Sequence, residues 1–261
     1  MTKLPISVFI ITKNEEDRIE QAVKSVINFA DEVLIIDSGS TDKTVQICKN
    51  LGVNVIFNEW RGYGQQKIFG ENQCKNDWIL NIDADERVSK ELIDEITKIF
   101  TKEIPNKYIC YKIKILNQFF NEDKPKKLAY YYNQLRLYNK NFAGFKNSTI
   151  HDSVTLKDKA EFNLISKLNN NISHQSFRSY AHWIEKIDNY SNMQAIEAFA
   201  KGKKISRFKI LITPLLSFIK GYFIRRYFIY GFNGIIYSYI FAFGRTLKMI
   251  KIREIFEKNK N

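Results

Sequence analysis

The first hundred residues alternate between continuous apolar runs and segments whose apolar positions recur at helical spacing. The apolar runs cover residues 6–11, 32–37, 53–57 and 78–82, and each has the length of a strand buried on both faces. Between the first two runs, the apolar positions of residues 19–30 follow the period of a helix. Strands that alternate with helices in this way predict right-handed crossovers and a parallel α/β sheet.

A short polar turn, residues 12–14, joins the first predicted strand to the first predicted helix. Asn14 is expected to cap that helix, and Glu15 and Glu16 would then lie in its first turn, where they complement the helix dipole. The turn contains no glycine. Because a dinucleotide-binding fingerprint needs glycines for close approach to a pyrophosphate, the turn argues against a nicotinamide or flavin enzyme.

The fourth apolar run ends abruptly in three carboxylates, Asp83, Asp85 and Glu86. In an open α/β sheet, ligands bind at the carboxyl ends of the strands. Asp83 and Asp85 are two residues apart, so in extended backbone they would project to the same side. A divalent cation would hold two such like charges together, and Mg²⁺ takes one or two carboxylates with water and substrate phosphates. The alternative is a solvated acidic turn before a helix capped by Ser89.

Other polar residues are expected at the same edge of the sheet. Asp37 ends the second strand, where its carboxylate could accept hydrogen bonds from a ribose or a base. Ser40 and Asp42 are interpreted as caps of the short helix that follows. Together, the polar groups predicted to gather at this edge are Thr12, Asn14, Asp37, Lys67, Asp83 and Asp85.

Positive charge is concentrated in the last third of the chain. The net charge is +13, yet from Lys201 onward fourteen lysines and arginines face only Glu254 and Glu257. Residues 1–200 therefore carry a net charge of about +1. Such asymmetry indicates an anionic partner for the basic third, either a nucleic acid or an anionic membrane surface.

The cysteines and the amino terminus indicate the compartment. Cys48, Cys74 and Cys110 are odd in number and form no CxxC pair, which favours neither a zinc site nor a disulfide framework. A reducing compartment is the expectation. The first strand pattern begins within a few residues of Met1, which leaves no room for a signal peptide.

Residues 207–250 combine apolar, aromatic and cationic positions. Residues 210–219 are too few to span a bilayer, and residues 227–244 lack charge but contain Asn233, Ser238 and four tyrosines. Aromatic residues with cationic flanks suit the headgroup region, so helices lying on the inner leaflet are expected. A spanning segment, a helical subdomain packed on the rest of the chain and a dimer interface are the alternatives.

Four segments resemble a known family. SVFIITKNEE (7–16), EVLIIDSGSTDKT (32–44), WRGYGQQK (60–67) and DWILNIDADE (77–86) are similar, in this order and spacing, to the family 2 inverting glycosyltransferases. The resemblance is greatest to the heptose β-1,4-glucosyltransferases of the lipopolysaccharide inner core. It implies the GT-A nucleotide-diphospho-sugar transferase fold, a Rossmann-like and mainly parallel sheet, here with a helical C-terminal extension.

The resemblance also implies roles for individual residues. Thr12, Asn14 and Glu15 match positions that line the uridine pocket, and Asp37 matches the carboxylate that contacts the uracil. Lys67 falls where the family has a basic residue touching the donor, although an ordinary exposed helix lysine is the alternative. Asp83 resembles the ribose-side aspartate and Asp85 the metal ligand, so that Mg²⁺ or Mn²⁺ is the implied cofactor.

Two histidine-containing segments follow. Transfer to a sugar hydroxyl needs a base for the hydroxyl proton and a cation for the leaving diphosphate. His151-Asp152 stands where the family branch has His-Glu, which implies Asp152 as the base and His151 near the diphosphate or the metal. His174, before a long helix that reaches Lys201, is interpreted as a cap, with donor-phosphate contact as the alternative. Phe232-Asn233-Gly234 replaces the branch's Leu-Asp-Gly, so any role for that acid is lost.

These inferences lead to one functional hypothesis. The chain is expected to be a metal-dependent inverting hexosyltransferase that moves glucose from UDP-glucose to a lipid-linked saccharide. Residues 1–105 would bind the donor, residues 106–200 would bind the acceptor, and residues 201–261 would form the basic extension. It would act in the cytoplasm, on the inner face of the membrane. Polyprenyl-phosphate glycosyl transfer is an alternative, and a nucleic-acid-binding protein is another. The apolar tail and the lack of a nucleic-acid-binding motif argue against the latter.

Overall fold

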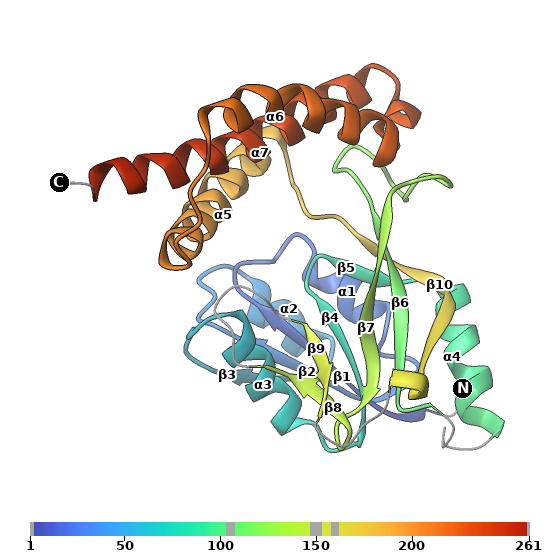
Figure 1. The fold of residues 1–261 in the computed structure, drawn as a ribbon. Coiled ribbons are helices and arrows are strands. Elements are labelled where there is room, and N and C mark those ends of the chain that lie inside the picture. Colours follow the sequence, from blue (N-terminus) through green and yellow to red (C-terminus); the bar gives the residue numbers. More distant parts are fainter. Residues whose placement is uncertain (1–2, 103–107, 147–152, 158–161, 260–261) are drawn as a thin grey trace. The chain divides into compact units, whose positions relative to one another are not determined.

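The computed structural model describes residues 3–102, 108–146, 153–157 and 162–259 (Figure 1). The chain forms two compact units. Unit 1 comprises Met1–Leu116 and Tyr131–His174, and unit 2 comprises Asn117–Tyr130 and Gln175–Asn261. The division falls after His174, earlier in the chain than the boundary at residue 200 that the sequence suggested.

Ten strands are assigned within the described residues, all of them in unit 1. They are β1 (Leu4–Thr12), β2 (Ala30–Asp37), β3 (Asn54–Phe57), β4 (Trp78–Asp83), β5 (Glu86–Val88), β6 (Cys110–Asn117, whose last residue belongs to unit 2), β7 (Tyr131–Asn139), β8 (Ala143–Phe145), β9 (Val154–Leu156) and β10 (Ile165–His174).

Helices connect these strands and make up most of unit 2. They are α1 (Ile19–Lys24), α2 (Thr44–Asn50), α3 (Tyr63–Gln73), α4 (Lys90–Lys102), the 3₁₀ turn η1 (Phe162–Leu164), α5 (Tyr180–Ala200), α6 (Arg207–Ile219), the π-helical turn η2 (Lys220–Ile224), the 3₁₀ turn η3 (Tyr227–Tyr230) and α7 (Phe232–Lys258).

Eight of the strands form one sheet in the order β3-β2-β1-β4-β7-β6-β10-β5. The first four pair in parallel, as the sequence predicts, and the pairs β4–β7, β7–β6 and β10–β5 are antiparallel. The predicted α/β class, with a Rossmann-like sheet and a helical C-terminal part, is confirmed. Because strand order reverses between β1 and β4, their carboxyl ends form the switch point where such sheets bind ligands.

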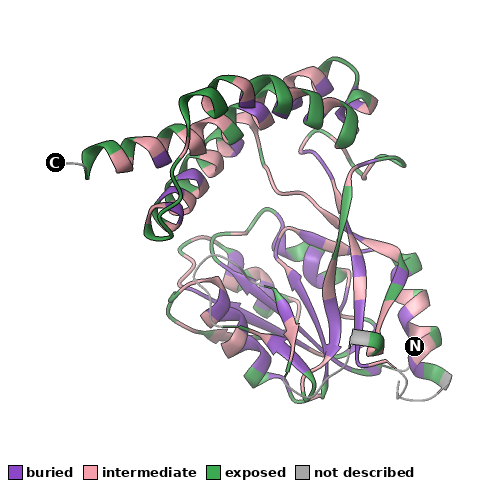
Figure 2. Ribbon diagram, in the orientation of Figure 1, coloured by how far each residue is buried: buried purple, intermediate pink, exposed green. Residues whose placement is uncertain are grey.

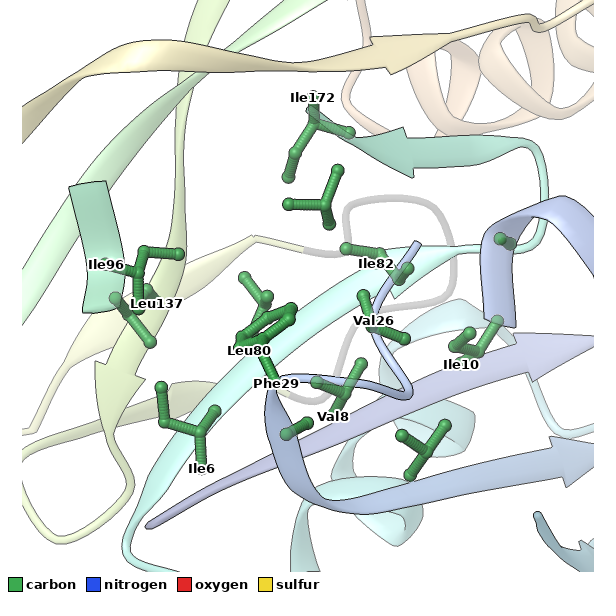
Figure 3. Close-up of a cluster of buried hydrophobic side chains, with 14 of the residues drawn as sticks. Ile6, Val8, Ile10, Val26, Phe29, Leu80, Ile82, Ile96, Leu137 and Ile172 are labelled. Atoms are coloured by element: carbon green, nitrogen blue, oxygen red, sulfur yellow. The ribbon is translucent and has the colours of Figure 1, made fainter. Parts of the chain in front are cut away.

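The central strands are buried on both faces because apolar residues occupy both sets of alternating positions. In β1, Ile6, Val8 and Ile10 join the cluster that α1, α2 and α4 cover, whereas Phe9 and Ile11 join the cluster on the α3 side. Figure 3 shows the first cluster, in which side chains from strands, helices and loops fill one continuous core. This packing fixes the positions of the strand ends, where the polar residues lie.

The first strand-to-helix connection differs from the prediction. Helix α1 begins only at Ile19. Neither Asn14 nor Arg18, which is the N-cap residue of α1, provides a side-chain hydrogen bond that caps the helix. Asn14 instead has a left-handed backbone conformation, with φ of 55°, and Glu15 and Glu16 precede the helix. The capping predictions for Asn14 and for the first helical turn are therefore wrong, because this loop bonds to the next loop along the sheet edge.

Unit 2 packs around a cluster of aromatic rings. Phe119, from the 117–130 segment, stacks on Tyr237 of α7 with ring centroids 3.8 Å apart, and Trp183 of α5 contacts both rings. The long helix expected before Lys201 is confirmed as α5, and Ser179 caps it by accepting from the His182 amide. The interpretation of His174 as a cap is thus wrong. Among the described helices, none has both the length and the apolar character needed to cross a membrane.

Candidate active site

The register of the parallel strands brings three predicted site residues to one edge. Thr12 of β1 is paired with Asp37 of β2, and the neighbouring Ile11 is paired with Asp83 of β4. The Thr12 hydroxyl is buried and has no hydrogen-bond partner in the described part of the chain. A buried hydroxyl without a partner is costly, so its presence at this edge is consistent with a bound ligand supplying the bond.

Asp37 organises the turn that follows its own strand. Its Oδ2 accepts hydrogen bonds from the amides of Gly39 and Ser40, at 2.9 and 3.0 Å, and its Oδ1 accepts from the Ser40 hydroxyl at 2.5 Å. Ser40 is engaged with Asp37 and with the Asn14 amide, so the expectation that it caps the next helix is wrong. Asp42 accepts from the Thr44 amide at the start of α2 and from the Glu16 amide.

Hydrogen bonds tie the loop after β1 to the loop after β2. The Asn14 amide donates to Ser40 Oγ at 2.9 Å, while Asn14 Oδ1 accepts from the Thr41 amide at 2.8 Å. The Glu15 amide donates to Thr44 Oγ1 at 2.7 Å. Asn14 and Glu15 thus lie beside Thr12 and Asp37, as predicted, and the paired loops hold this part of the edge in one conformation.

Asp83 is held by two buried cations. Lys67 Nζ, on α3, lies 2.8 Å from Asp83 Oδ1, and the Arg136 guanidinium, on β7, lies 3.1 Å from Asp83 Oδ2. The Lys67 side chain has no exposed surface, so the alternative of an ordinary exposed helix lysine is wrong. Burial raises the pKa of Asp83, but Lys67 and Arg136 outweigh it and hold that pKa well below its usual value.

Arg136 connects Asp83 to a second buried carboxylate. Its guanidinium lies 2.6 Å from Glu86 Oε1 and donates to Asn81 Oδ1 at 2.9 Å, while Glu86 Oε2 accepts from the Asp83 amide. Burial raises the pKa of Glu86 to about 7, although Arg136 acts to lower it. The end of β4 and the start of β5, on either side of the turn that joins them, therefore both contact one buried guanidinium.

Asp85 faces a different set of partners. Its Oδ2 lies 3.3 Å from His174 Nε2 and 3.8 Å from Arg18 Nη1, and Arg18 also pairs with Glu15 at 2.5 Å. Burial acts to lower the pKa of His174, but the Asp85 carboxylate prevails and raises it. The antiparallel register places His174 opposite Glu86, which is how the end of β10 reaches the acidic segment.

The two aspartates of the acidic segment do not share one face of a strand. Strand β4 ends at Asp83, and Ala84 and Asp85 form the turn into β5. The prediction that extended backbone projects both carboxylates to the same side is therefore wrong. Each carboxylate has its own cationic partners, so their repulsion is relieved without a shared cation.

The donor set fits a divalent cation that takes few ligands from the protein. The described residues contain no group of three or more His, Cys, Asp or Glu side chains that could enclose a metal ion. Asp83 is engaged with Lys67 and Arg136, so Asp85 is the carboxylate at the edge that could ligate a cation, and His174 beside it could do so only as the neutral imidazole, after releasing the proton that Asp85 favours. Mg²⁺ and Mn²⁺ prefer oxygen ligands, and one carboxylate such as Asp85 suffices when phosphate oxygens and water complete the shell.

The structure adds residues that the sequence did not single out. Arg136 and Arg18 were missed, Glu86 was seen only as part of the acidic turn, and His174 was assigned to capping. A signal for Arg136 exists: a lone arginine within the apolar strand pattern of 134–138 must find a buried partner. His151 and Asp152, the predicted catalytic pair, lie outside the described residues.

Comparison with known proteins agrees with this architecture. The family model described as Glycosyl transferase family 2 matches residues 7–157. A protein of Rickettsia bellii, named an uncharacterized glycosyltransferase, is 49% identical over 254 residues, which are 96% of this chain and 86% of the relative. The lipopolysaccharide core biosynthesis glycosyltransferase LpsC of Rhizobium meliloti is 27% identical over 258 residues, 96% of this chain and 92% of LpsC.

The chain also has a more distant similarity to a solved structure. Glucosyl-3-phosphoglycerate synthase from Mycobacterium tuberculosis, in complex with phosphoglyceric acid, is 14% identical, with a TM-score of 0.46 over 67% of this chain and 73% of that chain. The family model and the Rickettsia relative both extend over the strands whose carboxyl ends carry Thr12, Asp37 and Asp83. The chain therefore belongs to glycosyl transferase family 2 and is an enzyme that transfers glycosyl groups.

Proposed function

We propose that the enzyme is a metal-dependent inverting hexosyltransferase that moves glucose from UDP-glucose to a hydroxyl group of a lipid-linked saccharide. The lipopolysaccharide core is the proposed class of acceptor. The name of the Rhizobium relative, a lipopolysaccharide core biosynthesis glycosyltransferase, supports this class, since the likeness extends over nearly the whole of both chains.

One observation carries the proposal: Asp85 and His174 adjoin each other at the carboxyl edge of the sheet, beside an Asp83 that is kept ionised by Lys67 and Arg136. A sugar nucleotide presents a diphosphate and a ribose. This edge would offer Asp85, with its neighbour His174, to a cation, and the fixed carboxylate of Asp83, two residues before Asp85, to a hydroxyl group. An anionic diphosphate and a neutral ribose hydroxyl match those two features respectively.

In this proposal the residues of the sheet edge bind the donor. Thr12, Asn14, Glu15 and Asp37 would lie along the nucleoside, and Asp83 would accept from the ribose. Lys67 and Arg136 act on Asp83 in two ways, because they keep it charged and fix its orientation through separate oxygens.

Asp85 and His174 would hold Mg²⁺ or Mn²⁺. A bound cation supplies positive charge to the diphosphate that leaves the anomeric carbon. Direct displacement by an acceptor hydroxyl inverts the anomeric centre and needs no protein nucleophile. Asp152 is proposed to take the hydroxyl proton, with His151 near the diphosphate or the metal.

The proposed partners follow from this chemistry. A soluble nucleotide sugar and a lipid-linked saccharide can meet at the cytoplasmic face of the cytoplasmic membrane, which is the proposed location. Nucleic acid is not proposed as a partner, and a homodimer is a separate hypothesis that sedimentation of the full chain would test.

A donor screen tests the proposal. Release of nucleoside diphosphate would be measured from UDP-, GDP- and ADP-sugars, with Mg²⁺, with Mn²⁺ and with a chelator. UDP-glucose should give the highest rate, and the chelator should abolish it. Asp85→Asn should lose this activity while Asp94→Asn, an exposed aspartate on α4, should keep it. Equal rates with and without chelator would reject the metal-dependent form of the proposal.

The identity of the acceptor is tested separately. A phosphate acceptor, such as a polyprenyl phosphate, carries no hydroxyl proton that a base must remove, so it would tolerate Asp152→Asn. Loss of transfer in Asp152→Asn with intact UDP-glucose binding, measured by calorimetry, supports a hydroxyl acceptor. Undiminished transfer would instead assign the enzyme to the phosphate-acceptor class.

A further inference from the structure

Helix α6 presents most of its large apolar residues outward and its small polar residues inward. Thr213 and Ser217 are buried, with 7% and 8% of their surface exposed, whereas Leu211 and Leu215 are 78% and 58% exposed. Figure 2 shows α6 largely in the colour of exposed residues. An amphipathic helix of a protein in water has the opposite pattern, since its apolar face covers the core.

The inward face of α6 packs closely on α7 through small residues. Thr213 Oγ1 lies 3.2 Å from Met249 Sδ on α7, and a Cβ added at Gly221, in η2, would come within 3.2 Å of the Phe241 ring and 3.4 Å of the Ser238 backbone. Helices associate through small residues in this way where their outer surroundings are apolar, because the apolar side chains are then free to face outward.

Exposed apolar side chains continue beyond α6, along the segment that runs to the start of α7, and form an exposed apolar surface of unit 2. We call it the apolar face of unit 2. Its members are exposed leucine, isoleucine and phenylalanine side chains that follow one another from α6 through η2 and η3 to the start of α7: Phe208, Leu211, Leu215, Leu216, Ile219, Phe223, Ile224, Phe228 and Phe232. Apolar surface of this extent on a protein in water indicates a binding surface.

A row of cations adjoins this face. Lys203, Lys204, Arg207 and Lys209 are all exposed and lie at the amino end of α6, and the sequence contains no acidic residue between Lys201 and Arg253. Cations are unfavourable at the amino end of a helix, where the dipole is positive. Their concentration there therefore indicates an external anion.

The combination identifies the partner. We propose that the apolar face of unit 2 docks on an anionic lipid bilayer, with its leucine and phenylalanine side chains in the acyl boundary and the cations of the α6 amino end among the headgroups. The ten residues between Lys209 and Lys220 extend about 15 Å along a helix, half of the roughly 30 Å of hydrocarbon, so α6 would lie in the plane of the interface.

Vesicle flotation of the full chain tests this proposal, and no sugar nucleotide is needed, so the result does not depend on the proposed reaction. Vesicles of phosphatidylcholine alone and of phosphatidylcholine mixed with phosphatidylglycerol would be compared over a salt series. Binding should require the anionic lipid and should weaken as salt rises.

Two sets of variants separate the apolar and the charged contributions. The double variant Leu211→Ser, Leu215→Ser should lower the partition coefficient on the order of tenfold or more. The triple variant Lys203→Gln, Lys204→Gln, Arg207→Gln should lower it on the order of 100-fold at low salt. The control for the leucine variant is Ile196→Ser, at an exposed isoleucine on α5. The control for the charge variant is the triple variant Lys43→Gln, Lys49→Gln, Lys98→Gln, at three exposed lysines of unit 1. Both controls should bind vesicles like the parent chain.

Circular dichroism must show that each variant keeps the parent's helical content, which is expected because the altered side chains are exposed. Unchanged vesicle binding in the folded leucine variant would overturn the proposal. So would a dimer in lipid-free solution that the leucine substitutions dissociate, because a second copy would then cover the face. RNA binding that the lysine variant abolishes, without vesicle binding by the parent, would overturn it as well.

Discussion

His174 Nε2 lies 3.3 Å from Asp85 Oδ2, although 88 residues separate the two in the chain. The contact exists because β10 pairs with β5 in antiparallel register, with His174 opposite Glu86. His174, the last residue of unit 1, is thus brought beside the acidic segment that follows β4. The position of this histidine is set by sheet pairing and by the carboxylate it faces.

His174→Ala is expected to weaken Mn²⁺ binding at least about tenfold, because even groups that only orient a metal ligand are worth about 10–100-fold in affinity. Binding would be measured by electron paramagnetic resonance of free Mn²⁺ in the presence of UDP. His182→Ala is the matched control, since His182 lies on α5 in unit 2 and contacts the Arg178 amide. Equal Mn²⁺ affinity in both variants would remove His174 from the cation site.

Arg136→Met should destabilise unit 1 strongly. The substitution leaves Glu86 and Asp83 without their shared guanidinium, and removing one partner of a buried ion pair costs about 3–5 kcal/mol. Urea unfolding followed by tryptophan fluorescence would measure the change. Arg253→Met, which breaks a pair between a half-buried arginine and the exposed Glu257, should cost at most about 1 kcal/mol. Similar losses in the two variants would contradict the structural role of Arg136.

Glu95 is expected to make stability depend on pH in the acid range. Burial acts to raise the pKa of Glu95, but hydrogen bonds from the Asn169 and Asn170 amides outweigh it and lower that pKa. A depressed carboxyl pKa contributes stability above the unfolded value of 4.5, and this contribution is lost as pH falls through the folded value.

Glu95→Gln should therefore lower stability at pH 7 by about 1 kcal/mol and flatten the acid side of the stability profile. Thermal melting between pH 3 and pH 7, a range set around the carboxyl pKa, would show both effects. Glu91→Gln, an exposed neighbour on α4, should leave the profile unchanged. A Glu95→Gln profile parallel to that of the parent chain would contradict the prediction.

Tyr237→Phe tests whether the 117–130 segment belongs to unit 2. The Tyr237 hydroxyl donates to Asn121 Oδ1 at 2.8 Å, so its removal should cost about 1 kcal/mol and increase hydrogen exchange in residues 117–130. Tyr239→Phe is the matched control, because Tyr239 lies two residues further along α7 and is exposed. Unaltered exchange in the Tyr237→Phe variant would indicate that this hydrogen bond does not anchor the segment.

The sequence by itself determined the parallel half of the sheet and the location of the candidate site. Its apolar runs have the length and composition of buried strands, and the polar residues that end them had to meet at one edge because parallel strands share an orientation. For this reason, and from the family resemblance, the sequence could name seven residues of this edge in advance: Thr12, Asn14, Glu15, Asp37, Lys67, Asp83 and Asp85. It could also name Ser89 as a helix cap, which is confirmed because the Ser89 hydroxyl accepts a hydrogen bond from the Leu92 amide.

Only the tertiary structure decided which charges meet. The partners of Asp83 are Lys67 and Arg136, and those of Asp85 are His174 and Arg18; these pairs join residues from different elements, and no local pattern encodes them. The same holds for α6, whose sequence is apolar on the outside because its inner face had to fit closely against α7. Local periodicity fixes the elements, whereas packing between distant segments fixes the partner of each side chain.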